Sequence, residues 1–202
     1  MRTDGRRTVG MAISLTKRLF TVADYYRMAA TGILSPDDRV ELLEGEVVEM
    51  TPISSRHAGC VNYLGRELQR LIGSRAVVAI QNPVQLSDLS EPQPDLSVLK
   101  PRPDLYRESH PRPEDTWLVI EVADTSVETD RTVKGFLYAR AGVPEFWLVD
   151  LSSATIEVYR NPGEGGWAEG SLARSSERLS PAALPDVGLD VAEVFGETRV
   201  PD

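Results

Sequence analysis

An acidic residue, Glu121, lies inside the otherwise apolar stretch WLVIEVA, residues 117–123. This composition is typical of a strand at the centre of a sheet that is covered on both faces. Strand alternation places Trp117, Val119, Glu121 and Ala123 on one face. A carboxylate buried there without a partner is unfavourable, so such groups are paired, neutral or bound to a metal. The sequence thus leaves two interpretations of Glu121: a strand-end glutamate, paired with an arginine or exposed, or a functional carboxylate.

Composition limits the class of protein. The 202 residues are 41% hydrophobic, which suits one compact domain with an ordinary core. The single cysteine, Cys60, excludes an internal disulfide framework and a cysteine-based zinc site. No apolar run is long enough to cross a bilayer, and the start of the chain lacks the apolar region of a secretion signal. We expect a mobile arm over residues 1–18, a single domain over residues 19–197, and a cytoplasmic location.

Helical and strand patterns alternate along the chain. Cap signals predict helices from Thr21 to Ala30, from Ser35-Pro36 onward, from Ser54 or Ser55 to Gly73, and over residues 130–141. The expected strands comprise a hairpin around Glu44-Gly45, residues 76–81, 84–86, 94–99, 117–123, 145–150 and 154–160, a further strand from Trp167, and a small terminal element over residues 184–195. This order predicts an α/β fold, in which a mixed sheet is flanked by helices and preceded by a helix and a β-hairpin.

A second carboxylate, Asp95, starts the strand predicted over residues 94–99. By itself Pro94-Asp95 is a common turn dipeptide. Asp95 becomes a candidate site residue because Glu121 lies on a neighbouring predicted strand. Two converging carboxylates repel each other unless a cation lies between them. Hard carboxylate oxygens favour Mg²⁺ or Mn²⁺ over zinc.

A third candidate, Lys134, lies on the helix that follows the Glu121 strand. Val133 and Leu137 are expected to mark the buried face of this helix, which leaves Lys134 on its flank with a stem long enough to reach the sheet edge. The alternative is an ordinary surface pair between Lys134 and Asp130, four residues earlier.

Charge gives a mixed indication about nucleic acid. The net charge of −9 argues against broad, non-specific binding to nucleic acid. Basic residues nevertheless gather in one predicted loop, at Lys100, Arg102, Arg107 and Arg112. They are either a local contact for backbone phosphates or ordinary solvated loop charges.

Several segments together resemble the Uma2 family, whose members are restriction-endonuclease-like proteins with the PD-(D/E)xK nuclease fold. They are ELLEGEVVEM (residues 41–50), Ser54 to His57, Gln93-Pro94-Asp95, and VIEVADTSVETDRTVKGFLYARAGVPEFWLVD (residues 119–150). The resemblance covers residues 20 to 160. It implies that Asp95 is the aspartate of the PD motif and that Glu121 is the acidic residue of the (D/E)xK strand, both as metal ligands. The usual lysine position holds Ala123, and Lys134 is implied to replace it as the third catalytic residue.

The resemblance implies a Mg²⁺- or Mn²⁺-dependent endonuclease that hydrolyses phosphodiester bonds in DNA, with RNA as another substrate to consider. Glu41, Glu46 and His57 match further family positions, and together with Asp130 they are additional candidates for the site. Lys100, Arg102, Arg107 and Arg112 are expected to contact the nucleic acid. A homodimer is plausible because two-fold symmetry suits double-strand cleavage. The alternative function is a weakly active or inactive binding module on a nuclease fold.

Overall fold

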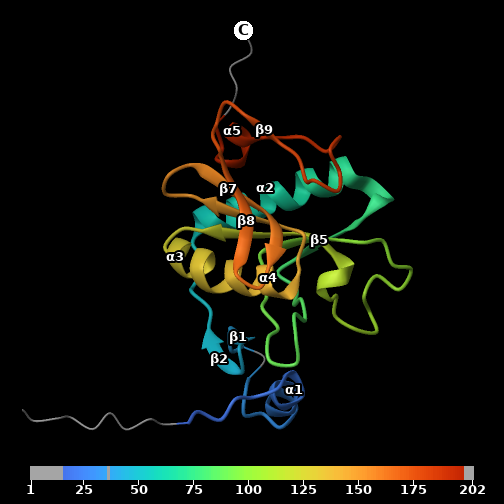
Figure 1. The fold of residues 1–202 in the computed structure, drawn as a ribbon, viewed down its shortest axis with the longest axis vertical. Helices are drawn as coiled ribbons and strands as arrows, with labels where there is room; N and C mark the ends of the chain where they lie inside the picture. Colours follow the sequence, from blue (N-terminus) through green and yellow to red (C-terminus); the bar gives the residue numbers. More distant parts are fainter. Residues whose placement is uncertain (1–15, 36, 198–202) are drawn as a thin grey trace, which may run out of the picture.

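The computed structural model describes residues 16–35 and 37–197, which form a six-stranded mixed sheet with helices on both faces (Figure 1). The strand order is β3-β4-β5-β6-β7-β8. β5 and β6 run parallel, and the other neighbours are antiparallel. The strands are β3 (Val77–Ile80), β4 (Leu96–Leu99), β5 (Thr116–Ala123), β6 (Glu145–Asp150), β7 (Thr155–Gly163) and β8 (Gly166–Ala173). The predicted mixed α/β sheet is confirmed.

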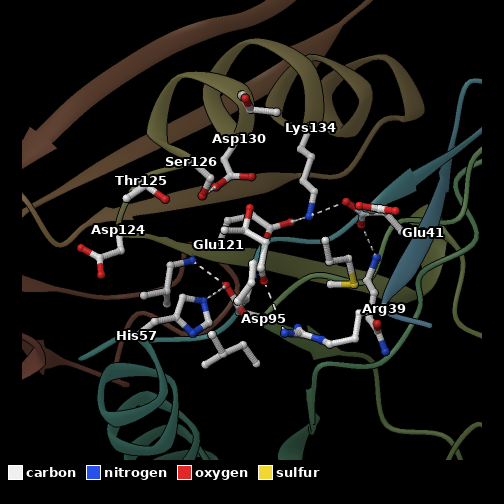
Figure 2. A pocket seen from close by; sticks show the side chains of 18 of the residues that line it. Arg39, Glu41, His57, Asp95, Glu121, Asp124, Thr125, Ser126, Asp130 and Lys134 are labelled. Atoms are coloured by element: carbon white, nitrogen blue, oxygen red, sulfur yellow. Dashed lines mark hydrogen bonds and ion pairs between the residues drawn. The ribbon is translucent and has the colours of Figure 1, made fainter. Parts of the chain in front are cut away.

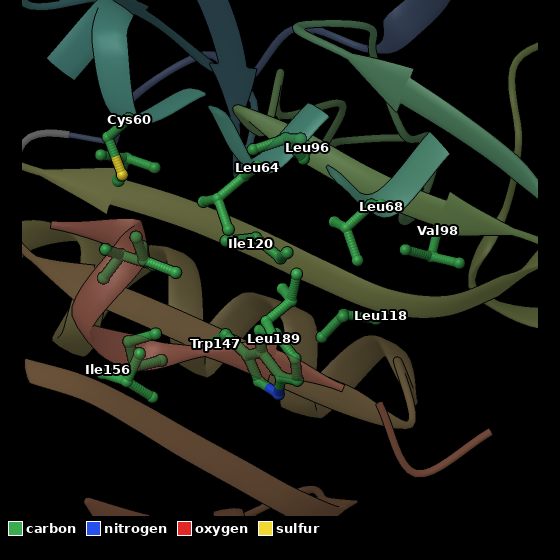
Figure 3. Packing of buried hydrophobic residues seen from close by; sticks show 14 of the residues in the cluster. Cys60, Leu64, Leu68, Leu96, Val98, Leu118, Ile120, Trp147, Ile156 and Leu189 are labelled. Carbon is green, nitrogen blue, oxygen red and sulfur yellow. The ribbon is translucent and has the colours of Figure 1, made fainter. Parts of the chain in front are cut away.

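One face of the sheet is covered by α2 (Ser55–Ile72), with the C-terminal elements beside it. Leu64 and Leu68 of α2 pack over Ile120 and Trp147 of the central strands (Figure 3). Ser54 caps the start of α2, because its side chain accepts the backbone N–H of His57. Of the two caps that the sequence allows, Ser54 and Ser55, the structure uses the first. The C-terminal elements are the pair β9 (Arg178–Leu179) and β10 (Leu189–Asp190), followed by the short α5 (Val191–Val194).

The opposite face is covered by the helical crossover that joins the parallel strands β5 and β6, as parallel pairing requires. It consists of α3 (Val127–Thr129), the π-helical turn η3 (Asp130–Lys134) and α4 (Gly135–Ala141). Beneath it, Val119 and Ala123 of β5 pack with Tyr138, Phe146 and Leu148. Alternation along β5 is therefore as predicted for Val119, Glu121 and Ala123. Trp117 packs toward the α2 side, because a register shift pairs Leu99 with Thr116.

An N-terminal helix and a hairpin extend from one end of the sheet (Figure 1). α1 (Val22–Ala30) has a capping box between Thr21 and Asp24, and the hairpin pairs β1 (Val40–Leu43) with β2 (Glu46–Glu49). Both were predicted. The hairpin is held to the core because Leu42 and Glu91 form a backbone bridge.

Three local predictions were wrong or incomplete. The helix expected from Ser35 does not form in the described residues: the Ser35 hydroxyl and carbonyl instead accept backbone N–H groups in a turn that leads into β1. Residues 84–86 form a loop, since Val84 and Leu86 bond within the segment that ends at Pro92. The helix expected over residues 130–141 begins at Val127 and contains the π turn. Most of the predicted arm, residues 1–15, lies outside the described residues.

Two short 3₁₀ turns, η1 (Gly73–Arg75) and η2 (Pro113–Asp115), complete the elements. Gly73 ends α2 as predicted, with a positive φ of 60°. Among the helices of the described residues, none combines the length and the apolar composition that a membrane span needs.

Candidate active site

Asp95 and Glu121 face the same pocket. Leu96 of β4 pairs with Ile120 of β5, so Asp95, one residue before β4, falls beside Glu121 on the neighbouring strand. Both carboxylates are buried and line a hollow of about 360 Å³ at the edge of the sheet (Figure 2). This hollow, called here the acidic pocket, is also lined by Glu41, His57, Asp130 and Lys134.

Lys134 points into the acidic pocket. Its Nζ lies 3.0 Å from Oε1 of Glu41 and 3.2 Å from Oε1 of Glu121, and the residue is 8% exposed. Of the carboxylates in the described part of the chain, those two lie within ion-pair distance of Lys134 and that of Asp130 does not. The interpretation of Lys134 as a surface partner of Asp130 is therefore wrong.

The π turn directs both Asp130 and Lys134 inward. The backbone N–H of Gly135 bonds to the carbonyl of Asp130, five residues back, which is the π-helical spacing. Asp130 is 6% exposed, whereas Val133 is 41% exposed, so the expected buried position of Val133 is wrong. An α-helical periodicity applied to residues 130–137 misplaces the inward face, because the π turn contains an additional residue.

The acidic pocket shifts the pKa values of the charged groups that line it. Burial raises the pKa of Glu121 to about 8, and the neighbouring charges of Asp130, Asp95 and Glu41 add to the effect, while Lys134 opposes it. Burial also raises the pKa of Asp130. Burial by itself lowers the pKa of Lys134, but the surrounding carboxylates outweigh it and the net shift is upward. Lys134 therefore stays protonated and neutralises part of the acidic charge.

Asp95 is held by three donors. Its Oδ2 accepts the backbone N–H of Val122 at 2.9 Å and lies 3.0 Å from Nε2 of His57. Its Oδ1 lies 3.3 Å from the amide nitrogen of Gln81. His57 comes from the first turn of α2, and its hydrogen bond to Asp95 raises the pKa of the imidazole. Gln81 has a positive φ of 51°, a strained conformation of a kind that recurs at functional sites.

Glu41 and Glu121 also accept hydrogen bonds from uncharged groups. The backbone N–H of Gln93 donates to Oε2 of Glu41 at 3.0 Å, which fixes the hairpin glutamate against the core. The hydroxyl of Tyr138 donates to Oε1 of Glu121 at 2.7 Å, and Tyr138 is fully buried. Ser126 donates to Oδ2 of Asp130. The sequence contained one signal for Tyr138, which lies four residues after Lys134 and so on the same face of the helix.

Several predicted residues lie outside the acidic pocket. Glu46, on β2, pairs with Lys17 at 2.7 Å and lines a different hollow. The loop with Lys100, Arg102, Arg107 and Arg112 follows the far end of β4 from Asp95, and none of the four lines the acidic pocket. Arg102 is paired with Asp104 in the same loop. Their contact with nucleic acid stays a prediction.

Ala123 lies at the position that the PD-(D/E)xK pattern gives to a lysine. It shares a face with Glu121, but it is fully buried in the apolar cluster with Tyr138, Val143 and Phe146. A lysine at position 123 would place its stem in this cluster. The amine instead reaches the pocket from Lys134, on the helix that covers the strand.

Comparison with known proteins identifies the fold and the family. A crystal structure described as a putative nuclease belonging to DUF820 from Anabaena variabilis has the same fold, with a TM-score of 0.69 and 15% sequence identity, over 88% of this chain and 98% of that one. No curated protein matches the sequence significantly. The model of the Uma2 family, described as "Putative restriction endonuclease", matches residues 22–192, which is most of the chain. The chain belongs to the Uma2 family.

Proposed function

We propose that the protein is an endonuclease that hydrolyses phosphodiester bonds in DNA with the help of Mg²⁺ or Mn²⁺. The observation that carries the proposal is the convergence of Asp95, Glu121 and Lys134 in one buried pocket. Two carboxylates from adjacent strands and one amine form the residue set of the PD-(D/E)xK nucleases that the sequence resembles. The family description, "Putative restriction endonuclease", supports the same reaction class.

The donor set fits a hard divalent cation. Within residues 16–35 and 37–197, no group of three or more His, Cys, Asp or Glu side chains is arranged to hold a metal. Mg²⁺ does not require such a group, because it commonly binds through one or two carboxylates and keeps several waters. Asp95 and Glu121 would hold it here. When bound, such a cation polarises a phosphate oxygen and lowers the pKa of a coordinated water.

The other residues of the pocket have separate roles in this proposal. Lys134 keeps its proton and lies where it can orient the attacking water or stabilise negative charge that develops on the phosphoryl group. Glu41 holds the ammonium from the side opposite Glu121. The hydrogen bonds from His57 and the Val122 N–H hold the Asp95 carboxylate in one orientation.

An inactive binding module is the second candidate function. Its motivation is the same Lys134, whose charge is engaged by two carboxylates, together with the net charge of −9. A fold does not guarantee its usual activity. RNA as the substrate and a homodimer as the active form are further proposals that the same assays address.

The deciding experiment is cleavage of supercoiled, linear and single-stranded DNA and of an RNA strand, with Mn²⁺, Mg²⁺ or EDTA. We expect metal-dependent cleavage that falls at least about 100-fold in Asp95→Ala and Glu121→Gln. Glu169→Gln, an exposed glutamate on β8, is the matched control and should cut normally. Full activity of Asp95→Ala would refute the assignment. Absence of cleavage at high concentrations of folded wild-type protein would favour the inactive module.

A further inference from the structure

A second hollow adjoins the acidic pocket. It encloses about 500 Å³, within the roughly 300–1,000 Å³ that is usual for sites that bind small organic groups. We call it the tyrosine hollow, because Tyr25 and Tyr26 of α1 line it. The residues that line both hollows are Arg39, Glu41, Met50, Ile53 and Gln93. The two hollows are therefore adjacent, and residues of the hairpin and its flanks line both of them.

Tyr26 offers a fixed aromatic surface. Its hydroxyl donates to Oε1 of the buried Glu91 at 2.6 Å, and its ring contacts Tyr25 edge-on and His110 in a stacked arrangement. The hydroxyl of Tyr25 donates to the carbonyl of Val40. Both hydroxyls are thus occupied, while Tyr26 remains 42% exposed. What the pair presents to a ligand is ring surface rather than hydrogen-bonding groups.

The charges around the tyrosine hollow exclude an anion from its interior. Three carboxylates border it, those of Glu41, Glu91 and Asp38. Each already accepts a hydrogen bond inside the protein, from Gln93, Tyr26 and Ser35 respectively. Their negative charge would repel a phosphate, but it does not penalise a neutral, flat group that stacks on an aromatic ring.

Arg39 stands where the two hollows meet. It lines both of them, it is exposed, and Figure 2 shows it beside the acidic pocket. The other lining residue with a permanent positive charge, Lys134, is enclosed by Glu41 and Glu121. Arg39 is therefore the cation of this region that an incoming phosphate meets first. Guanidinium groups suit phosphate oxygens well.

We propose that the tyrosine hollow binds the base of an unpaired nucleotide adjacent to the cleaved phosphate, with Arg39 on the intervening phosphate. The proposal rests on the proposed nuclease function and narrows its substrate to strands that are single-stranded near the cut. A base inside a duplex is stacked on its neighbours and cannot enter a hollow. Aromatic stacking of this kind is the usual way in which proteins hold single strands without reading their sequence.

The test is fluorescence anisotropy in EDTA, which prevents metal-dependent cleavage, with the full chain and a fluorescein-labelled 12-mer DNA, either single-stranded or in a duplex. We expect the wild type to bind the single strand at least about ten-fold more tightly than the duplex. Tyr26→Leu, which removes the ring, should weaken single-strand binding about ten-fold, and Tyr26→Phe should change it by less than about two-fold. Thermal unfolding checks that each variant is folded.

Arg39→Gln should weaken single-strand binding. The slope of log affinity against log salt concentration should fall by about 1, which corresponds to one lost phosphate contact. Arg66→Gln, an exposed arginine on α2 that lines neither hollow, is the matched control and should leave both unchanged. Equal affinity for strand and duplex, with no effect of Tyr26→Leu, would overturn this inference while leaving any measured cleavage intact. Selective single-strand binding without cleavage in Mn²⁺ would support base binding in the tyrosine hollow. It would contradict only the proposed nuclease activity.

Discussion

The ammonium nitrogen of Lys134 lies 3.2 Å from Oε1 of Glu121, although the two residues come from different layers of the fold. In the PD-(D/E)xK pattern the amine belongs to the same strand as the acid, two residues later. Here that position is Ala123, which is fully buried in the apolar cluster under α4. The helical crossover over this cluster carries Lys134, whose amine lies beside Glu121. The same chemical group thus reaches the acid from another element of the fold.

Lys134→Ala should abolish most cleavage, by about 100-fold or more, because a positive group near the attacked phosphate is lost. It should also lower the free energy of unfolding by about 3–5 kcal/mol in EDTA, since Glu41 and Glu121 lose their shared cation in a buried site. Cleavage and urea denaturation measure the two effects. Lys134→Arg should recover part of the activity, and Lys100→Ala, in the distant loop, should change neither quantity.

Normal cleavage by folded Lys134→Ala would remove Lys134 from the mechanism. A variant that unfolds at room temperature would leave Lys134→Arg as the deciding comparison, because a guanidinium preserves the charge. Wild-type cleavage rates in Lys134→Arg would then show that position 134 requires only a charge and not an amine.

Metal affinity should increase with pH up to about 8. The pKa of Glu121 is raised to about 8 in the metal-free protein, so below that pH the carboxyl must release a proton before it can bind a cation. For one proton, the apparent affinity rises about ten-fold per pH unit and levels off above pH 8. Calorimetric titration with Mn²⁺ in two buffers of different ionisation enthalpy measures the proton release. A constant affinity between pH 6 and 8.5 would contradict the burial argument, and Glu121→Gln should remove the pH dependence.

Stability without metal should change in the opposite direction. The folded-state pKa of Glu121 lies above its usual value of 4.5, so between those pH values the folded protein holds a proton that the unfolded chain has lost. The contribution of Glu121 to stability is therefore lost as pH rises from about 4.5 toward 8, by at most about 1.4 kcal/mol per pH unit. Urea unfolding in EDTA at pH 6 and pH 8 measures it. Added Mg²⁺ should restore stability more at pH 8 than at pH 6.

The strands and their acids were predictable because each depends on local sequence. An acidic residue within WLVIEVA indicates a functional position, and alternation gives its face without knowledge of the fold. The hairpin, the Thr21 cap and the Ser54 cap likewise follow from residues that are close in the chain. The closeness of Asp95 and Glu121 required in addition that β4 and β5 be neighbours in the observed register.

The remaining features depend on long-range contacts. The π turn moves Lys134 from the flank of its helix to the inward face, and nothing in residues 127–141 separates a π turn from a regular helix. Arg39 lines the acidic pocket, and Gln81 reaches Asp95, because of where the hairpin and the loop of residues 81–93 are anchored. Ser35-Pro36-Asp37-Asp38 is a sound helix start by composition, but β1 begins at Val40 and no room for a helix remains.

Tyr138 should position Glu121. Its hydroxyl and Lys134 share Oε1 of that carboxylate, which leaves Oε2 to turn toward the acidic pocket. Tyr138→Phe keeps the ring against Phe146 and removes one hydrogen bond to Glu121. That bond is worth about 1.5–3 kcal/mol when the carboxylate is ionised, the form that binds a cation. We expect Mn²⁺ affinity to fall about ten-fold, and cleavage at low metal to fall in parallel. High Mn²⁺ concentrations should restore much of the rate, because the hydroxyl orients a ligand and does not touch the reacting phosphate.

A purely structural role for the Tyr138 hydroxyl would lower the unfolding temperature but leave the metal dependence unchanged. Tyr159→Phe is the matched control. Its hydroxyl also donates to a glutamate, Glu157, and its ring also contacts Phe146, but neither Tyr159 nor Glu157 lines the acidic pocket. Both variants thus lose a tyrosine hydroxyl from the same aromatic cluster. If the two shift the Mn²⁺ requirement equally, the hydroxyl of Tyr138 acts through stability alone, and Glu121 is oriented by Lys134 without it.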